Sequence, residues 1–159
     1  MAADFQGLIE ALVRHRVGFV IIGGVALVLH GSSRVTQDLD ICYSRNPDNL
    51  ERLAMALEPM HPSLRGAPRD LPFRLDARAL RSGLNFTLTS EIGDIDLLGE
   101  VPGVGGYEEV AADATTMDIF GRPVLVMSLA NLERAKRSAG RLKDLADLAE
   151  IEDLKRRSR

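Results

Sequence analysis

Two periodicities of apolar residues alternate along the chain and predict which parts form helices and which form strands. Apolar residues spaced three and four apart mark the buried stripe of a helix, whereas short apolar or alternating runs mark strands. The first stripe begins at Phe5, directly after Asp4, a residue that can cap a helix. Further expected helices start after Gly24, at Pro47, after Ser128 and at Arg141, and residues 107–112 are expected to form a short helix or a turn. The expected strands span residues 19–22, 38–42, 85–89, 94–98, 115–120 and 123–127.

Strands interleaved with helices predict an α/β (α+β) fold, in which helices flank a mixed β-sheet and further helices follow at the C-terminus. The chain has 159 residues, of which 45% are hydrophobic, so it is long enough to bury a core in one domain. We expect this single domain to span residues 1–159. Its core would occupy about residues 1–127 and its C-terminal helical segment about residues 128–156.

Charge and composition narrow the classes of partner and the expected location. A formal net charge of −3 gives no general attraction to nucleic acid, so contact with RNA would need a local basic patch. The closing residues 155–159 form such a patch and are expected to be a disordered basic tail. The single cysteine, Cys42, excludes an internal disulfide. No export signal or long apolar span is expected, so the sequence predicts a cytoplasmic protein without a membrane partner.

Candidate chemistry begins where the apolar run 19–22 ends on Gly23 and Gly24 and passes into a second apolar run, as in a buried strand that turns into a buried helix. Two glycines at this point leave backbone N–H groups accessible to a ligand. Asp38 and Asp40 follow in the sequence Asp-Leu-Asp-Ile, and alternation along a strand places both carboxylates on one face. The two carboxylates repel each other unless a cation or a shared proton relieves the repulsion. Magnesium, which prefers oxygen ligands, is the natural candidate, and a solvated edge-strand face is the alternative.

The motif apolar-Gly-Gly followed by Asp38-x-Asp40 resembles the signature of the DNA polymerase beta-like nucleotidyltransferase superfamily. More narrowly, Arg34-x-Thr36-x-Asp38-x-Asp40 resembles the AbiEii and MenT-like toxin branch of that superfamily. The C-terminal part is similar to the Lys…Gly-Arg-x-Lys-Asp…Asp segment that closes short members of this branch. The matching residues there are Lys136, Gly140, Arg141, Lys143, Asp144 and Asp147. The resemblance covers both ends of the chain and only weakly its middle.

The resemblance implies transfer of a nucleoside monophosphate from an NTP to an acceptor, with Mg²⁺ (or Mn²⁺) held by three carboxylates. Asp38 and Asp40 would be the first two. The expected strand 94–98 carries Asp94 and Asp96 on one face, and either could supply the third. Asp96 matches the family context of an acid between two apolar residues, so we choose Asp96 as the third ligand and keep Asp94 as the alternative.

The same resemblance implies which residues contact the nucleotide. They are Gly23, Gly24, Ser32, Ser33, Arg34, Lys136 and Lys143. Arg34 can clamp phosphate oxygens with two N–H groups, and its alternative role is a surface arginine that pairs with an acid. Lys136 and Lys143 would neutralise charge on the leaving pyrophosphate. Their alternative role is ion pairing on a solvated helix face, for example between Lys143 and Asp147.

The middle of the chain supports two interpretations. Residues 61–76 are rich in proline and show little periodicity, so they form either an acceptor-binding loop or a plain surface connection. The arginines of this region and its continuation give it a basic character. They are Arg65, Arg69, Arg74, Arg78 and Arg81.

The function that the resemblance implies is a metal-dependent nucleotidyltransferase with an acceptor hydroxyl on tRNA or protein, in a toxin–antitoxin or phage-defence setting. Its partners would be an NTP, the acceptor, and a cognate antitoxin or toxin. Two alternatives stay open: a non-catalytic nucleotide-binding module such as an antitoxin, and a small-molecule nucleotidyltransferase of the aminoglycoside type.

Overall fold

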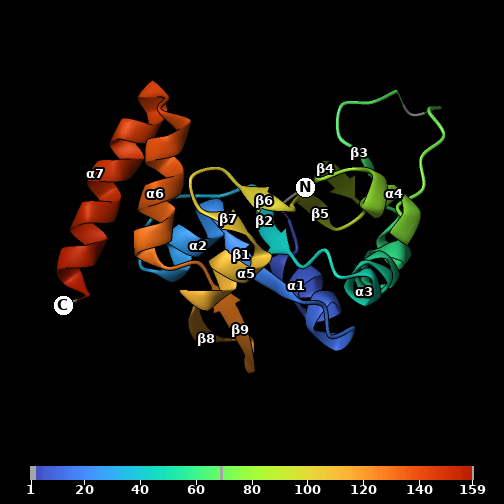
Figure 1. Ribbon diagram of the computed structural model, residues 1–159, viewed down its shortest axis with the longest axis horizontal. Helices are drawn as coiled ribbons and strands as arrows, with labels where there is room; N and C mark the ends of the chain where they lie inside the picture. The colour runs from blue at the N-terminus through green and yellow to red at the C-terminus, as the bar shows by residue number, and fades with distance from the viewer. Residues whose placement is uncertain (1–2, 69, 159) are drawn as a thin grey trace.

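The computed structural model describes residues 3–68 and 70–158 and shows a mixed β-sheet flanked by helices, as the apolar pattern predicts (Figure 1). The helices are α1 (Phe5–Arg14), α2 (Gly23–Leu29), α3 (Pro47–Leu57), α4 (Ala77–Ser82), α5 (Tyr107–Ala112), α6 (Leu129–Ala139) and α7 (Leu142–Arg157), with a 3₁₀ turn η1 (Glu58–Met60). The strands are β1 (Phe19–Ile22), β2 (Asp38–Tyr43), β3 (Ser63–Leu64), β4 (Asn85–Ser90), β5 (Gly93–Leu98), β6 (Glu100–Val101), β7 (Gly105–Gly106), β8 (Thr115–Ile119) and β9 (Arg122–Val126).

Seven strands form the main sheet in the order β3-β4-β5-β2-β1-β9-β8. Two of its pairings are parallel, β2 with β5 and β1 with β9, and the others are antiparallel. Strands β1 and β2, which carry the two motifs of the sequence, therefore lie side by side in the middle of the sheet. Strand β5, far from them in sequence, is the other neighbour of β2.

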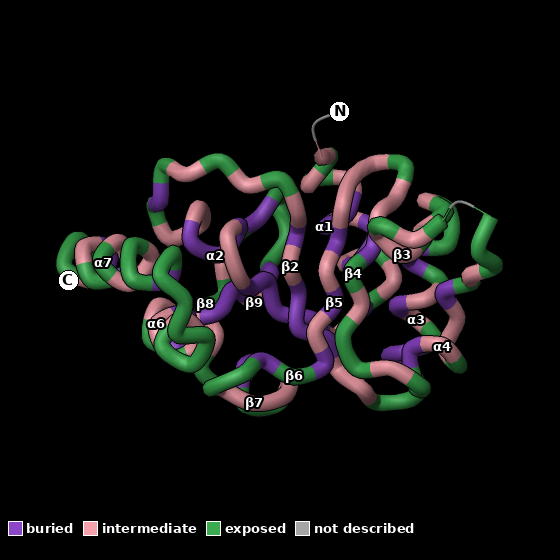
Figure 2. Tube along the Cα trace, turned by 90° about the horizontal axis from the view of Figure 1, so that it is seen from above, coloured by how far each residue is buried: buried purple, intermediate pink, exposed green. Residues whose placement is uncertain are grey.

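The alternation of side chains along these strands separates the core from a polar face. Leu39 and Ile41 of β2 pair with Ile95 and Leu97 of β5, and all four side chains are fully buried. The aspartates between them project to the opposite face and remain partly exposed. Figure 2 shows the buried residues concentrated in the central strands and the helices packed on them, whereas α7 is mostly exposed. The burial of one face thus fixes the direction of the carboxylates on the other.

Local signals set most helix boundaries. The carboxylate of Asp4 accepts the N–H of Gly7 and caps α1, Asn46 caps α3 ahead of Pro47, and Ser128 caps α6. Gly140, in the left-handed conformation at φ 64°, ends α6 where the sequence predicts an interruption.

The middle of the chain contains two elements that the sequence analysis missed. The two residues of β3 pair with β4 at the edge of the sheet, and α4 follows with Asp76 as its cap. Residues 102–104 connect β6 to β7, and the two short strands pair as a small hairpin. Arg69, counted among the basic residues of this region, lies outside the described residues.

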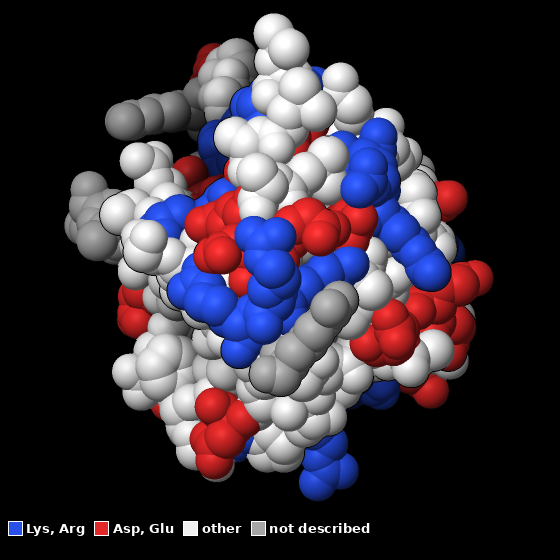
Figure 3. Space-filling model, turned by 90° about the vertical axis from the view of Figure 1, so that its left-hand side faces the viewer, with Lys and Arg blue, Asp and Glu red and all other residues white. Residues whose placement is uncertain are grey.

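The expectation of a disordered tail at residues 155–159 is wrong for the part that the structure describes. Helix α7 continues to Arg157, because Leu154 is buried and Lys155 forms an ion pair with Glu133 of α6. Figure 3 shows that basic side chains on the α7 side lie next to acidic ones, not in a purely basic surface. Arg159 lies outside the described residues. Within residues 3–68 and 70–158, no helix combines the length and the apolar character needed to cross a membrane.

Candidate active site

Three carboxylates meet on the polar face of the central strands. The parallel register places Asp40 of β2 opposite Asp96 of β5, and Asp38 opposite Asp94. One oxygen from each of Asp38, Asp40 and Asp96 lies within 4.8 Å of the others. Among the described residues, these three are the ones whose geometry allows them to share a metal ion. We call them the aspartate cluster.

The electrostatics of Asp40 indicate that this member of the aspartate cluster lacks a positive partner among the described residues. Burial, together with the neighbouring charges of Asp38 and Asp96, raises the pKa of Asp40 to about 8. Its Oδ1 atom is buried and accepts no hydrogen bond from the described residues. A buried carboxylate oxygen without a donor is costly unless a proton or a cation lies beside it. The donor set of three carboxylates, one with an unsatisfied oxygen, fits a divalent ion such as Mg²⁺ or Mn²⁺.

Gly23 forms the turn between β1 and α2 and lies against the cluster. Its φ is 65°, in the left-handed region, and a Cβ added there would collide with the carboxylate of Asp40. Ile22, the residue before it, pairs with Asp40 across β1 and β2, which brings the turn this close. At Gly24 an added Cβ would meet the side chain of Thr36 at 3.4 Å, an ordinary contact. The first glycine of the motif is therefore the one that the geometry requires.

The loop between α2 and β2 contacts α7. The Ser32 hydroxyl, which is buried, donates to Glu150 at 2.8 Å, and Nη2 of Arg34 donates to Asp147 at 2.6 Å and to Glu150 at 2.7 Å. Ser33 is exposed. For Arg34, the structure thus shows the pairing with acids that the sequence analysis gave as the alternative, and its contact with a nucleotide stays a prediction.

The two lysines of the C-terminal segment lie in different environments. Lys136 of α6 lines the same pocket as Asp40 and Asp96, and its Nζ lies 2.9 Å from an oxygen of Asp147. Lys143 is exposed on the first turn of α7 and is not among the residues that line this pocket. The pairing of Lys143 with Asp147 that we considered is replaced by the pairs of Asp147 with Lys136 and Arg34.

This pocket has a volume of about 370 Å³ and combines an acidic end with an apolar wall. Asp40 and Asp96, beside Gly23, supply the acidic groups, and Lys136 and Arg141 also line the pocket and carry positive charge. The wall comes from β1, the end of β5, the β6–β7 hairpin, the connection between β9 and α6, and α6 itself. Its apolar members are Ile22, Leu98, Val101, Pro102, Met127, Leu132, Ala135 and Ala139. A pocket of this size, apolar with a few convergent charged groups, is typical of a small-ligand site.

Two arginines at the site were missed as functional candidates. Nη2 of Arg65 donates to Oδ1 of Asp96 at 2.8 Å, and its Nε lies 3.2 Å from Asp94. No local signal distinguishes Arg65 from the other arginines of its region, because its role depends on the pairing of β3 with β4. Arg141 was quoted in the C-terminal motif without a role. It binds Asp144, whose pKa it lowers to about 2 through side-chain and backbone hydrogen bonds.

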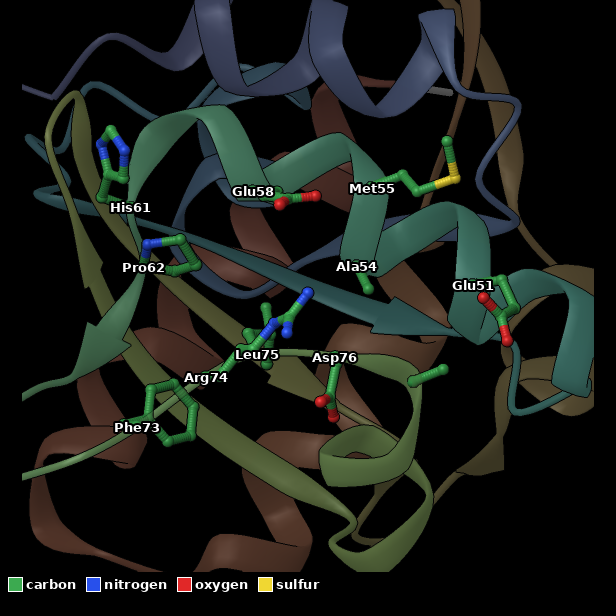
Figure 4. A pocket seen from close by; sticks show the side chains of 11 residues that line it. Glu51, Ala54, Met55, Glu58, His61, Pro62, Phe73, Arg74, Leu75 and Asp76 are labelled. Carbon is green, nitrogen blue, oxygen red and sulfur yellow. The ribbon is translucent and has the colours of Figure 1, made fainter.

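A second pocket, of about 470 Å³, lies between α3 and the segment before α4 (Figure 4). Figure 4 shows Met55 and Glu58 from α3 and its continuation on one side, and Phe73 and Asp76 on the other. No residue of the aspartate cluster lines it. The pocket beside the cluster is therefore the candidate active site.

Comparison with solved structures places this arrangement in a known fold. The lincosamide antibiotic adenylyltransferase LnuA, bound to lincomycin, matches with a TM-score of 0.62 over 97% of this chain and 99% of that chain, at 15% identity. The chain has the nucleotidyltransferase fold. A putative nucleotidyltransferase from Thermotoga maritima matches with a TM-score of 0.58 at 12% identity, over 93% of this chain and 89% of that one. The antibiotic-resistance factor ANT(2'')-Ia matches with 0.55 at 14% identity, over 94% and 85%.

No family model and no curated protein sequence matches the chain. The structural likeness agrees with the superfamily that the motifs resemble. The AbiEii and MenT-like branch stays a prediction, because identities of 12–15% extend to the fold alone.

Proposed function

We propose that the protein is a divalent-metal-dependent nucleotidyltransferase that moves a nucleoside monophosphate from an NTP to an acceptor hydroxyl. The observation that carries this proposal is the aspartate cluster, three carboxylates with a buried, unsatisfied oxygen on Asp40, at the end of a ligand-sized pocket in a nucleotidyltransferase fold. In the reaction, a bond forms between the acceptor oxygen and the α-phosphorus, the bond from that phosphorus to pyrophosphate breaks, and the hydroxyl proton is released.

The carboxylates divide into two functions. Asp38 and Asp40 would hold Mg²⁺ or Mn²⁺ together with the triphosphate, and Asp96 would hold the metal on the acceptor side. The bound metal would neutralise phosphate charge and lower the pKa of the acceptor hydroxyl. Asp40 would release its proton when the metal binds, since both compete for the same oxygens.

The nucleotide would occupy the pocket, with its base against the apolar wall and its phosphates toward Lys136. Gly23, Gly24, Ser32 and Ser33 would face the phosphates from the other side, and Lys143 would need to approach from the surface of α7. Arg34 would exchange its carboxylate partners on α7 for phosphate oxygens. Such an exchange replaces charge-assisted hydrogen bonds to two carboxylates by charge-assisted hydrogen bonds to phosphate oxygens.

For the acceptor, the resemblance of the Arg34-to-Asp40 motif to toxin nucleotidyltransferases supports tRNA or protein, in a cytoplasmic toxin–antitoxin or phage-defence setting with a cognate partner. A second candidate is a small molecule. It is favoured by the structural neighbours, since LnuA is an adenylyltransferase of lincosamide antibiotics and ANT(2'')-Ia was solved with adenylyl-tobramycin.

An intact-mass screen tests the proposal. Total tRNA, cellular protein and a panel of antibiotics are each incubated with the protein, each NTP and Mg²⁺, and the mass of one nucleoside monophosphate is sought on the acceptor. We expect this mass with the wild type and not with Asp40→Asn. NTP binding without transfer to any acceptor would favour the non-catalytic binding module, and absence of both binding and transfer would contradict the proposal.

A further inference from the structure

The guanidinium of Arg65 lies against the aspartate cluster. It is the residue directly after β3, and its backbone N–H donates to the carbonyl of Thr87 in β4. Its Nη2 donates both to the Leu88 carbonyl, at 2.6 Å, and to Oδ1 of Asp96, at 2.8 Å. These hydrogen bonds to the backbone of β4 hold the guanidinium at the edge of the cluster, so its position beside Asp96 is restrained by the fold.

The cation of Arg65 pairs with one carboxylate of the cluster, Asp96, whereas Asp38 and Asp40 form no ion pair with the described residues. Burial raises the pKa of Asp96, and Arg65 acts against this by favouring the ionised carboxylate. Asp40, in contrast, keeps an oxygen that accepts no hydrogen bond. On the polar face, Asp96 is thus paired with a cation of the protein itself, whereas Asp38 and Asp40 would need a bound cation.

We propose that Arg65 competes with the divalent metal for Asp96, and that Arg65 stays paired with Asp96 until the metal and the nucleotide bind together. This inference rests on the proposed function, because it takes the aspartate cluster to be a metal site. With Arg65 in place, a metal ion meets only Asp38 and Asp40 as unpaired ligands, and it must approach a fixed positive charge. Arg65 therefore makes binding of the free metal weak, and the triphosphate, which adds oxygen ligands and negative charge, restores it.

The geometry gives the competition a clear physical origin. A magnesium ion lies about 2.0–2.1 Å from its oxygen ligands, so an ion on Asp96 would come close to the guanidinium that already binds the same carboxylate. Two cations on one carboxylate repel each other, and the repulsion is weakly screened in a partly buried site. Arg65 thus positions Asp96 in the metal-free protein, and its charge weakens metal binding to the same carboxylate.

The test measures Mn²⁺ binding without nucleotide, from the electron paramagnetic resonance signal of the unbound ion. We expect Arg65→Gln to bind Mn²⁺ about tenfold more tightly than the wild type, because a close like charge is removed. Arg65→Lys keeps the charge and should stay within about threefold of the wild type. Arg78→Gln is the matched control, since it removes an equal charge from an exposed position in α4 and should leave Mn²⁺ binding unchanged.

The outcomes distinguish failure of the inference alone from failure of the metal assignment on which the inference rests. Unchanged or weaker Mn²⁺ binding by Arg65→Gln overturns the inference and leaves the metal site intact, because Arg65 would then only support Asp96. Tighter binding that survives the further substitution Asp40→Asn shows that the ion binds elsewhere, and overturns the inference and the metal assignment together. Absence of Mn²⁺ binding by every variant, with and without ATP, overturns both as well. A circular dichroism melt confirms that each variant is folded.

Discussion

Asp40 of β2 lies opposite Asp96 of β5 in a parallel pairing, so the two carboxylates project from the same face of the sheet at the same level. Residues far apart in sequence thereby carry like charges to one point, where Asp38 adds a third. Folding alone does not favour this arrangement, because burial and mutual repulsion both oppose the ionised form of Asp40. The predictions below follow from the need for a cation or a proton at this point.

The first prediction concerns the stability of the metal-free protein. Asp40→Asn should raise the free energy of unfolding at pH 7 by at least about 1.4 kcal/mol, the equivalent of one pKa unit. The folded-state pKa, about 8, lies above the ordinary value of 3.8, so the folded protein binds an extra proton between these pH values and the wild type loses stability as pH rises through this window. The gain from Asp40→Asn should therefore grow from pH 4 to pH 8.

Urea unfolding with a chelator present, at several pH values, measures this effect. Asp118→Asn, a change of the same kind in β8 at the far edge of the sheet, serves as the control and should show no comparable growth. A constant difference between wild type and Asp40→Asn across the window would mean that folding does not raise the pKa of Asp40, and would contradict this prediction.

The second prediction concerns the glycine turn. Gly23→Ala should destabilise the fold and abolish Mn²⁺ binding, because its Cβ would push the Asp40 carboxylate out of the cluster. Gly121→Ala is a matched control, since Gly121 also has a positive φ, of 81°, but open space around its Cβ position. We expect the control to lose about 1 kcal/mol from backbone strain alone and to keep Mn²⁺ binding. Equal losses in both variants, with metal binding retained, would count against the contact between the turn and Asp40.

The third prediction concerns the third carboxylate. Asp96→Asn should remove nucleotidyl transfer while ATP binding through Asp38 and Asp40 largely persists, because Asp96 belongs to the cluster. Asp94→Asn should reduce transfer only slightly, since Asp94 pairs with Arg65 at the edge of the site. Transfer rates and calorimetric ATP affinities distinguish the two variants. Loss of transfer in Asp94→Asn with retention in Asp96→Asn would reverse the assignment.

The fourth prediction concerns the nucleotide. ATP binding should require Mg²⁺ or Mn²⁺, and Arg34→Ala should weaken it about tenfold, as expected for the loss of one charge-assisted contact. Arg122→Ala, at an exposed position in β9, removes the same charge and should leave the affinity unchanged. Isothermal titration calorimetry measures both. Tight binding of ATP without a metal, or an Arg34→Ala variant with normal affinity, would remove Arg34 from the nucleotide site.

The sequence predicted the elements that carry the aspartates because their burial is periodic and local. Leu39 and Ile41 are buried as alternation requires, and this burial directs Asp38 and Asp40 to the other face. The choice of Asp96 over Asp94 came from the resemblance, since alternation treats the two alike. The structure brings Asp96 into the cluster through the register of β5 against β2, which no local pattern specifies.

The partners of charged residues were the part that the sequence did not predict. Arg65 reaches Asp96 only because β3 pairs with β4, and a two-residue edge strand has too few residues to show a periodicity. Arg34 and Lys136 both pair with Asp147 because α7 packs beside α6 and the loop before β2. Such contacts depend on the tertiary arrangement, so the sequence could not decide between contact with a nucleotide and ion pairing for these residues.

The most direct test of the account is a crystal structure with Mn²⁺ and a non-hydrolysable ATP analogue, in which anomalous scattering locates the manganese. The account predicts an anomalous peak at bonding distance, about 2.0–2.3 Å, from carboxylate oxygens of Asp38 and Asp40, with the triphosphate on the same ion and Lys136 beside it. Manganese bound away from the aspartate cluster, or the analogue bound outside the pocket beside it, would contradict the assignment of this site to nucleotidyl transfer.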